Sequence, residues 1–331
     1  MLLGVLDIGS ISAQLQVFEA CPGAPPLPTH TVKKPTLVRE ATNPDGTIQA
    51  ACVDRVIAAV TKAMRTARRL GVQRVYVFIT SSFRDAPNRD EILDRVEAEA
   101  GIRPQFLSGA DEGRLTYLAV HHWCAWPAGR QLVLDIGGGS MEIAFGHDAE
   151  PELSISLPLG AGQLTRAFLP DDPPSSAQLA GLRGHVTATL REVARRLAAE
   201  AAPDRVIGTS KTFKQLARLT GSPGQPTGPF AGRSVTRTDL EAWIPRLAAL
   251  GALRRAELPG LSRSRSRQIL AGAITAGATM TALSVDSIDV CPWALREGIV
   301  LHYLQVTHSE SFDLPFRPLP PPSSITHAQR A

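Results

Sequence analysis

The chain has 331 residues, of which 44% are hydrophobic, and a formal net charge of +4. This length and composition exclude a wholly disordered chain and predict two folded domains. A net charge this mild does not predict nucleic-acid binding, so no nucleic acid is expected as a partner.

The first half is predicted to begin with two strands joined by a glycine turn. Residues 2–6 form an apolar run that stops at residues 7–10, Asp-Ile-Gly-Ser, and residues 14–18 alternate between polar and apolar side chains. Strands alternating with helices indicate an α/β fold. The elements expected next are a helix over residues 52–70, a strand over 75–79, a helix over 88–100, a short strand over 105–107 and a helix from residue 111.

The second half repeats the opening pattern. Residues 132–134 lead into residues 135–140, Asp-Ile-Gly-Gly-Gly-Ser, and residues 141–145 alternate again. Two copies of one strand-turn-strand unit predict a duplicated fold with one copy in each domain. The remaining expected elements are a strand over residues 205–208 and helices over 175–201, 212–219, 238–250, 265–283 and 293–304.

The domain boundary is expected near residue 127, where turn-forming residues follow the last helix of the first half. The predicted N-terminal domain covers residues 1–127 and the predicted C-terminal domain covers residues 128–306. Residues 307–331 are rich in proline, serine and other polar residues, which predicts a disordered tail.

Neither the start of the chain nor its cysteines indicate secretion. The first residues lack the basic head, the longer apolar stretch and the cleavage site of a signal peptide, and no apolar run is long enough to span a bilayer. A cytoplasmic protein without a membrane partner is therefore expected. The cysteines are scattered without the spacing of a zinc site or a disulfide framework, so they are expected to be reduced, buried thiols: Cys21, Cys52, Cys124 and Cys291.

The two glycine turns are the first candidates for a binding site. Glycine lets backbone N–H groups converge on an oxyanion, and an aspartate at the end of the preceding strand, Asp7 or Asp135, adds a hard oxygen ligand for magnesium. Each turn opens a strand, whereas a dinucleotide-binding turn opens a helix. A purely structural turn is the alternative, and its repetition favours function. The candidate phosphate-binding residues are Gly9, Ser10, Gly137, Gly138, Gly139 and Ser140.

Strand alternation places Glu142 on the same face as Ser140. It could hold the water shell of a metal, or be a strand glutamate that faces solvent. Asp111 and Glu112 open a predicted helix, and acidic residues there by themselves indicate helix capping.

Other polar groups also follow predicted strands, at the end where ligands bind in α/β folds. Ser82 and Arg84 follow the strand over residues 75–79, and Ser210 with Lys211 follow the strand over residues 205–208. The arginine run of residues 263–267 could line the path of a polyanion, or it could be the solvated entrance of a helix.

Taken together, these motifs resemble the successive motifs of exopolyphosphatases and guanosine pentaphosphate phosphohydrolases. The likeness runs in order over residues 3–304, and within that family it is nearest to the short actinobacterial forms. It implies the duplicated two-domain fold shared with actin, sugar kinases and chaperone ATPases, with substrate in the cleft between the domains. The motifs that carry the resemblance are residues 7–10, 80–86, 109–114, 135–142, 156–160, 208–211 and 292–298.

The resemblance also implies roles for individual residues. Glu112 matches the general base that acts on the attacking water, with Asp111 as the fallback. The metal-binding carboxylates match Asp135 and Glu142, with Asp7 in the first loop, and the metal is expected to be Mg²⁺ or Mn²⁺. Phosphate contacts are implied for the two glycine turns and for Ser82, Arg84, Ser210, Lys211 and Arg265.

The reaction implied is release of the terminal phosphate from inorganic polyphosphate by water. Three alternatives remain open: hydrolysis of guanosine pentaphosphate by the same centre, a weakly active regulator that binds polyphosphate or nucleotide, and an ATPase of the actin or sugar-kinase type. A homodimer is compatible with the resemblance.

One residue departs from the family pattern. The first loop of the family continues Gly-Ser-Asn, whereas this chain has Ile11 in place of the asparagine. If the asparagine contacts phosphate or braces the turn, Ile11 weakens phosphate binding. The rival hypothesis is that Ile11 packs into the core and that the loop binds phosphate through backbone N–H groups alone.

Overall fold

The structure, a computed structural model, describes residues 1–80, 83, 86–125, 129–222 and 231–306, with the side chains of residues 39–40 left out. The chain forms two compact units, which we describe separately: Met1–Leu107 with the last described residues from Tyr303, and Ser108–His302. The division falls before residue 108 and not at the expected residue 127. The reason is that helix α4 (Gly109–Cys124) packs on strands of the second unit.

The first unit is built on a five-stranded mixed sheet in the order β3-β2-β1-β4-β5. Helices α1 (Ala50–Arg69) and α3 (Arg89–Ala100) cover one face and bury an apolar stripe against it. A short 3₁₀ helix, η1 (Val38–Ala41), precedes α1. The strands are β1 (Leu2–Ile8), β2 (Ser12–Glu19), β3 (Pro28–Pro35), β4 (Arg74–Ile79) and β5 (Gln105–Phe106).

The second unit has a six-stranded sheet in the order β10-β11-β9-β6-β7-β8. Its strands are β6 (Gln131–Ile136), β7 (Met141–Gly146), β8 (Leu153–Leu157), β9 (Arg205–Thr209), β10 (Ser234–Thr236) and β11 (Ser287–Val290). Its other helices are α5 (Ala161–Phe168), α6 (Ser176–Leu197), α7 (Ser210–Leu219), α8 (Arg237–Ala249), α9 (Ala252–Arg255), the 3₁₀ helix η3 (Arg263–Arg265), α10 (Ile269–Ala282) and α11 (Leu295–Val306), whose last residues belong to the first unit.

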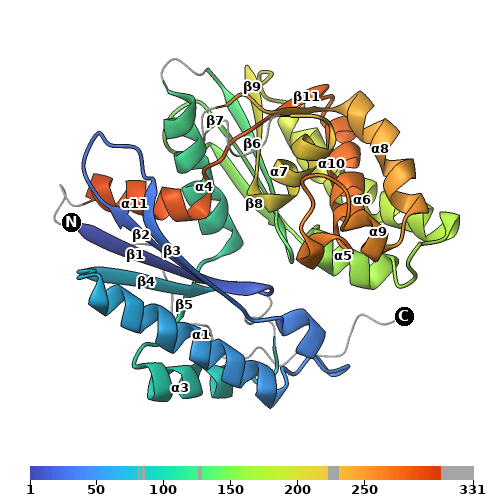
Figure 1. Cartoon of the computed structure of the whole chain (residues 1–331). Helices are drawn as coiled ribbons and strands as arrows, with labels where there is room; N and C mark the ends of the chain where they lie inside the picture. The colour runs from blue at the N-terminus through green and yellow to red at the C-terminus, as the bar shows by residue number, and fades with distance from the viewer. Residues whose placement is uncertain (81–82, 84–85, 126–128, 223–230, 307–331) are drawn as a thin grey trace. The chain divides into compact units, whose positions relative to one another are not determined.

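Alternating side chains give the second sheet two separate cores. Leu134 and Ile136 of β6 pack with the helices that include α6, α8 and α10, on one side of the sheet (Figure 1). Val133 of β6 and Ala144 of β7 face the other way and pack with α4 and α11. By the same alternation, Asp135 and Glu142 lie on the α4 face of the sheet.

Both predicted strand-turn-strand units are present as antiparallel hairpins, β1–β2 and β6–β7. Strands β3, β8, β10 and β11 and helix α5 were not predicted from the sequence. The late helix was expected from residue 265 but begins at Ile269, because residues 263–265 form η3. Of the four free cysteines, Cys52 and Cys291 are buried as expected, Cys124 is half-buried, and Cys21 is exposed against the prediction.

No helix within the described ranges is long and apolar enough to cross a membrane. The tail predicted over residues 307–331 lies outside the described residues.

Candidate active site

The second hairpin turns over four residues, from Gly137 to Ser140. The Gly137 N–H donates to the carbonyl oxygen of Ser140 at 2.9 Å, which closes the turn. A Cβ on Gly137 would lie 3.2 Å from that same oxygen, so a glycine fits the turn better than a larger residue. The turn therefore brings the ends of β6 and β7 together with little side-chain bulk above them.

The start of helix α5 fixes the orientation of this turn. The N–H groups of Ala161 and Gly162 donate to the carbonyl oxygens of Gly137 and Gly138 at 3.1 and 3.0 Å. Since a trans peptide holds its C=O and N–H in opposite directions, the next N–H groups, those of Gly138 and Gly139, point away from α5. Backbone donors therefore converge on the open side of the turn, where they could bind an anion.

Gly160 permits this close approach. A Cβ at Gly160 would collide with the backbone of Gly139 and Ser140. The backbone of Gly160 is in the ordinary extended region, with φ −69°, which any residue can adopt. Glycine is therefore required because a side chain would clash, and not because of the backbone conformation. The sequence motif over residues 156–160 thus ends in a residue that holds the phosphate turn against α5.

Two carboxylates lie opposite each other at the end of the hairpin. Asp135 of β6 pairs with Glu142 of β7, and Glu142 is only 6% exposed. Burial raises the pKa of Asp135 to about 6, while the positive charges of Lys214 and Arg265 oppose this rise. Burial and the neighbouring Asp135 raise the pKa of Glu142 to about 7. The pair therefore lacks enough positive charge to stabilise both carboxylates fully.

A serine on the neighbouring strand orients Glu142. The Ser156 hydroxyl of β8 donates to Glu142 Oε1 at 2.8 Å. Helix α4 packs directly on β8 because Gly109 and Gly113 have no side chains: a Cβ on either would collide with Ser156 or Ser154. A Cβ on Gly113 would also lie 3.7 Å from the Glu142 Cβ, so α4 begins beside this carboxylate.

The first turn of α4 gives Asp111 and Glu112 different environments. Ser108 caps the helix by accepting from the Asp111 N–H at 3.1 Å, and its hydroxyl donates to the Asp111 carboxylate. Asp111 is 6% exposed and is also 3.6 Å from Arg114. Glu112 is half-buried in the same turn. Ser108 is thus the helix cap, and the Asp111 carboxylate is held by the Ser108 hydroxyl and by Arg114.

The junction of β9 and α7 supports the end of β6. Ser210 and Thr212 donate their hydroxyls to the Ile136 carbonyl at 3.0 and 2.7 Å. Lys214, on the next turn of α7, donates to the Pro292 carbonyl at 2.6 Å, and burial lowers its pKa. Ser210, predicted to bind phosphate, thus contacts the backbone here, and Lys211 is exposed.

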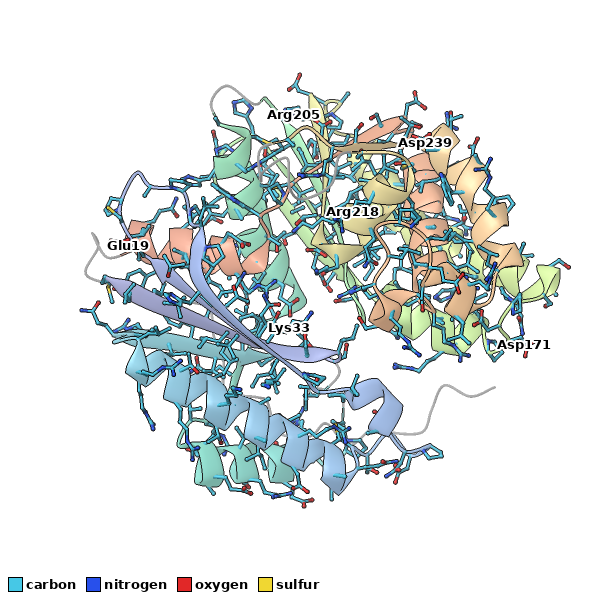
Figure 2. The ribbon with its side chains drawn as sticks, in the orientation of Figure 1. Glu19, Lys33, Asp171, Arg205, Arg218 and Asp239 are labelled. Carbon is cyan, nitrogen blue, oxygen red and sulfur yellow. The ribbon has the colours of Figure 1, made fainter. Side chains whose placement is uncertain are left out.

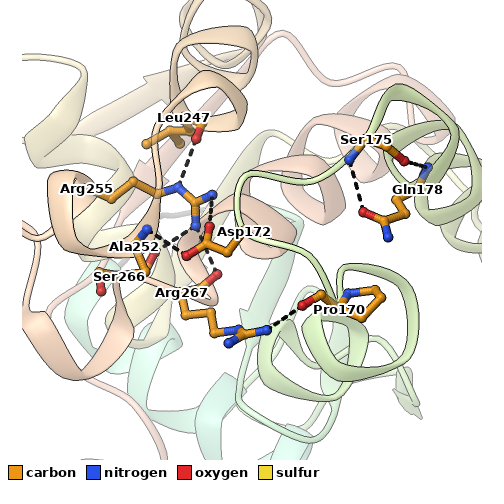
Figure 3. A network of polar contacts seen from close by, with 9 residues as sticks. All are labelled: Pro170, Asp172, Ser175, Gln178, Leu247, Ala252, Arg255, Ser266 and Arg267. Atoms are coloured by element: carbon orange, nitrogen blue, oxygen red, sulfur yellow. Dashed lines mark hydrogen bonds and ion pairs between the residues drawn. The ribbon is translucent and has the colours of Figure 1, made fainter.

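A buried arginine holds the segment that carries Arg265 (Figure 3). Arg255 is 1% exposed, and its guanidinium donates to the carbonyls of Leu247 and Ser266 and to Asp172 Oδ1 at 2.8, 3.2 and 2.8 Å. Ser266 follows Arg265 directly, so this network fixes the position of Arg265, whose charge acts on Asp135. The arginine run of residues 263–267 is anchored, although Arg263 and Arg267 themselves are exposed.

The first hairpin, in the other unit, has the same turn. The Gly9 N–H donates to the Ser12 carbonyl at 3.1 Å, and Asp7 pairs with Gln14. Thr36 and Val38 donate to the carbonyls of Gly9, Ser10 and Ile11, so the N–H groups that follow point away from this segment. Ile11 is half-buried.

The second unit brings together most of the predicted site. Asp135, Glu142, Arg265 and the glycine turn lie at one end of the sheet, next to the start of α4 with Glu112. Asp7, Gly9 and Ser10 lie together in the first unit. Ser82 and Arg84 lie outside the described residues.

Known proteins resemble this chain along most of its length. A model of the Ppx/GppA phosphatase family matches residues 22–307. Exopolyphosphatase 1 of Mycobacterium leprae is 44% identical over 304 residues, which cover 92% of this chain and 90% of that protein. The chain belongs to the Ppx/GppA phosphatase family.

Two further proteins resemble this chain at lower sequence identity. The crystal structure of the Aquifex aeolicus Ppx/GppA family member superposes with a TM-score of 0.78 at 27% identity, over 93% of this chain and 99% of that one. A guanosine-5'-triphosphate,3'-diphosphate pyrophosphatase of Aeromonas salmonicida is 26% identical over 308 residues, which cover 93% of this chain and 60% of that protein. These relatives confirm the predicted family and its duplicated actin-like α/β fold.

For a Ppx/GppA protein, the donor set fits a magnesium-type ion. No group of three or more His, Cys, Asp or Glu side chains among the described residues could hold a metal by itself. The buried pair Asp135 and Glu142 nevertheless has too little positive charge nearby, from Lys214 and Arg265, to stabilise both carboxylates fully. Mg²⁺ is usually held by one or two carboxylates together with water and substrate phosphates, so two carboxylates suffice.

Three residues that build this site were not predicted individually from the sequence. Lys214 lies one helical turn after Lys211, and this spacing was the available signal. Ser156 and Gly160 were noted only as parts of a motif, because their partners, Glu142 and the Gly139–Ser140 backbone, are distant in sequence.

Proposed function

We propose that this chain is an exopolyphosphatase, which hydrolyses the terminal phosphoanhydride bond of inorganic polyphosphate. The observation that carries the proposal is the buried pair of Asp135 and Glu142 beneath a glycine turn whose N–H groups point outward. The site offers anion donors on the turn and hard oxygen ligands at the strand ends. Phosphoryl transfer depends mainly on positioning and charge compensation, which such a site supplies.

In this proposal the backbone N–H groups of Gly138 and Gly139 bind oxygens of the terminal phosphate. Arg265 and Lys214 add positive charge on the Asp135 side. Asp135 and Glu142 would hold Mg²⁺ or Mn²⁺, which would offset the charge that develops on the phosphate oxygens. Asp7, Gly9 and Ser10 lie together in the first unit, and their role in binding metal and phosphate stays a prediction from the family resemblance.

Glu112 is proposed as the general base that orients and deprotonates the attacking water. The α4 position beside Glu142 supports this role, because the helix begins where the terminal phosphate would lie. Asp111 is a weaker candidate, since Ser108 and Arg114 both contact its carboxylate. Ser210 is better suited to hold the end of β6 than to contact phosphate.

Phosphate release from four substrates, measured side by side with Mg²⁺ or Mn²⁺, tests the proposal. The substrates are long-chain polyphosphate, tripolyphosphate, guanosine pentaphosphate and ATP. We expect the highest kcat/KM for polyphosphate and loss of activity in EDTA. Preference for guanosine pentaphosphate would favour the nucleotide hydrolase, and binding of polyphosphate without phosphate release would favour a regulator. Undiminished activity in EDTA would contradict the metal assignment.

A further inference from the structure

A cavity of ≈550 Å³ opens beside the candidate active site, entirely within the second unit. One wall is helix α7, and the opposite wall is the segment of residues 260–262. The two walls meet closely: a Cβ on Gly260 would collide with the side chain of Arg218. Of the described residues that line this cavity, Lys214 alone takes part in the proposed reaction, as a positive charge near Asp135.

The cavity is lined by four cationic side chains and by no carboxylate among its described lining residues. Lys211, Lys214 and Arg218 come from one face of α7, and Arg233 comes from the residue before β10. Figure 2 labels Arg218 on this helix. Four like charges around one hollow repel one another, so an anion that enters it gains from all four.

A buried amide adds a polar group to the same wall. Gln215 is 5% exposed, and one end of its amide bonds the Ser262 hydroxyl at 2.9 Å. The other end is buried without a hydrogen-bond partner among the described residues. The unpaired end is the carbonyl oxygen Oε1, which only accepts hydrogen bonds, so a phosphate oxygen would not satisfy it. The affinity of the cavity for an anion therefore depends on its cationic side chains.

Helix α7 contributes residues both to the cavity and to the candidate site. Lys214 lines the cavity, and its charge also acts on Asp135. Ser210 and Thr212, on the same helix, bond the Ile136 carbonyl at the end of β6. A ligand could therefore extend from the glycine turn along α7 into the cavity.

We infer that this cavity binds the internal phosphates of a polyphosphate chain while its terminal phosphate lies at the Asp135–Glu142 hairpin. The inference rests on the proposed function. A linear polyanion carries negative charge on every residue, which matches cations spread along a helix face. A purine nucleotide fits less well, because none of the described lining residues is an aromatic side chain that could stack on a base.

Binding measurements on a slow-turnover background test this inference. We would measure Kd for long-chain polyphosphate and for tripolyphosphate in Glu112→Gln protein, alone and with Arg218→Ala or Arg233→Ala added. The quantity to compare is Kd for long-chain polyphosphate divided by Kd for tripolyphosphate. Each arginine removed should raise this ratio about tenfold, because a charge-assisted contact to the long chain is lost. The slope of log Kd against log salt should fall by about one for each arginine removed.

Two controls separate binding from folding. Arg191→Ala removes the same charge from an exposed position on α6 and should leave the Kd ratio unchanged. Arg218→Lys keeps the charge and should retain most of the long-chain affinity, with a melting temperature close to that of Arg218→Ala.

The inference is overturned if Arg218→Ala and Arg233→Ala weaken both polyphosphates equally, or no more than Arg191→Ala does. It is also overturned if they weaken guanosine pentaphosphate binding and spare polyphosphate. Absence of polyphosphate hydrolysis by the wild-type protein would instead defeat the proposed function, while the binding ratios would still report on the cavity.

Discussion

The two hairpins β1–β2 and β6–β7 share one backbone design and differ in the chemistry placed on it. In each, a glycine closes the turn by donating to a serine carbonyl, at 3.1 Å in the first and 2.9 Å in the second. In each, N–H groups of a later segment donate to the carbonyl oxygens of the turn: residues 36–38 in the first hairpin and the start of α5 in the second. The N–H groups of the turn therefore point away from that segment. The strand-end pairs differ: Asp7 faces Gln14, whereas Asp135 faces Glu142. A duplicated scaffold thus keeps its anion-binding backbone while only the second copy carries two opposed carboxylates.

The largest expected effect comes from making the second hairpin resemble the first. Glu142→Gln would give it the Asp and Gln pair of β1–β2 and remove one ligand charge. We expect metal-dependent phosphate release to fall by about two orders of magnitude or more. The reciprocal control, Gln14→Glu, should give no gain in activity. Activity within twofold of wild type for Glu142→Gln would contradict the metal role of Glu142.

The same variant should be more stable than the wild type without metal. Because burial raises the pKa of Glu142 to about 7, the folded protein binds this proton more tightly than the unfolded chain. Stability then falls as pH rises from the ordinary glutamate pKa of 4.5 through about 7. In urea unfolding with EDTA, the free energy of unfolding of Glu142→Gln should be about 1–3 kcal/mol higher than that of the wild type at pH 8. At low pH the two proteins should have equal free energies of unfolding.

A third prediction concerns the segments that brace the turns. Gly160→Ala places a methyl group against the backbone of Gly139 and Ser140, so it should lower stability by about 1–3 kcal/mol and weaken phosphate binding. Gly181→Ala in α6 is the matched control, because its Cβ meets nothing within 4 Å. That change should stabilise the protein by about 0.5–1 kcal/mol. Equal thermal melts for the two variants would contradict the packing described for Gly160.

The smallest effect is expected in the first turn. Ile11→Asn should raise phosphate affinity or turnover by about tenfold if the amide adds a charge-assisted contact. Ile11 is half-buried and its carbonyl accepts from the Thr36 and Leu37 N–H groups, so backbone donors alone could serve this turn. A lower melting temperature with no kinetic gain would support the backbone-only hypothesis. Kinetics and a thermal melt of this one variant decide between them.

Sequence patterns predicted both hairpins because each shows the same clear signal. That signal is an apolar run followed by a glycine turn and then by alternating polar and apolar residues. Strand β3 was missed because its residues are mostly polar and lie between Pro28 and Pro35 on an exposed edge. Helix α5 was missed because its N-cap, Gly160, has no side chain to cap it, and the first N–H groups of the helix instead bond the turn over residues 137–138. Such elements depend on contacts distant in sequence.

The candidate site shows the same limit. The residues of the glycine turn and the carboxylates could be named from local motifs and the family resemblance. The supports could not: Ser156 bonds Glu142 from another strand, and Arg255 bonds the segment that carries Arg265 from another helix. Their roles follow only from the folded arrangement.

In the proposed mechanism, Glu112 activates water for attack on a phosphate held at the second hairpin. Single-turnover phosphate release from polyphosphate by Glu112→Gln and Asp111→Asn tests it most directly. We expect Glu112→Gln to lose about 10²–10⁴ in rate with polyphosphate affinity nearly unchanged, and Asp111→Asn to lose stability more than rate. Wild-type turnover in Glu112→Gln together with an inactive but folded Asp111→Asn would contradict the account and move the base to Asp111.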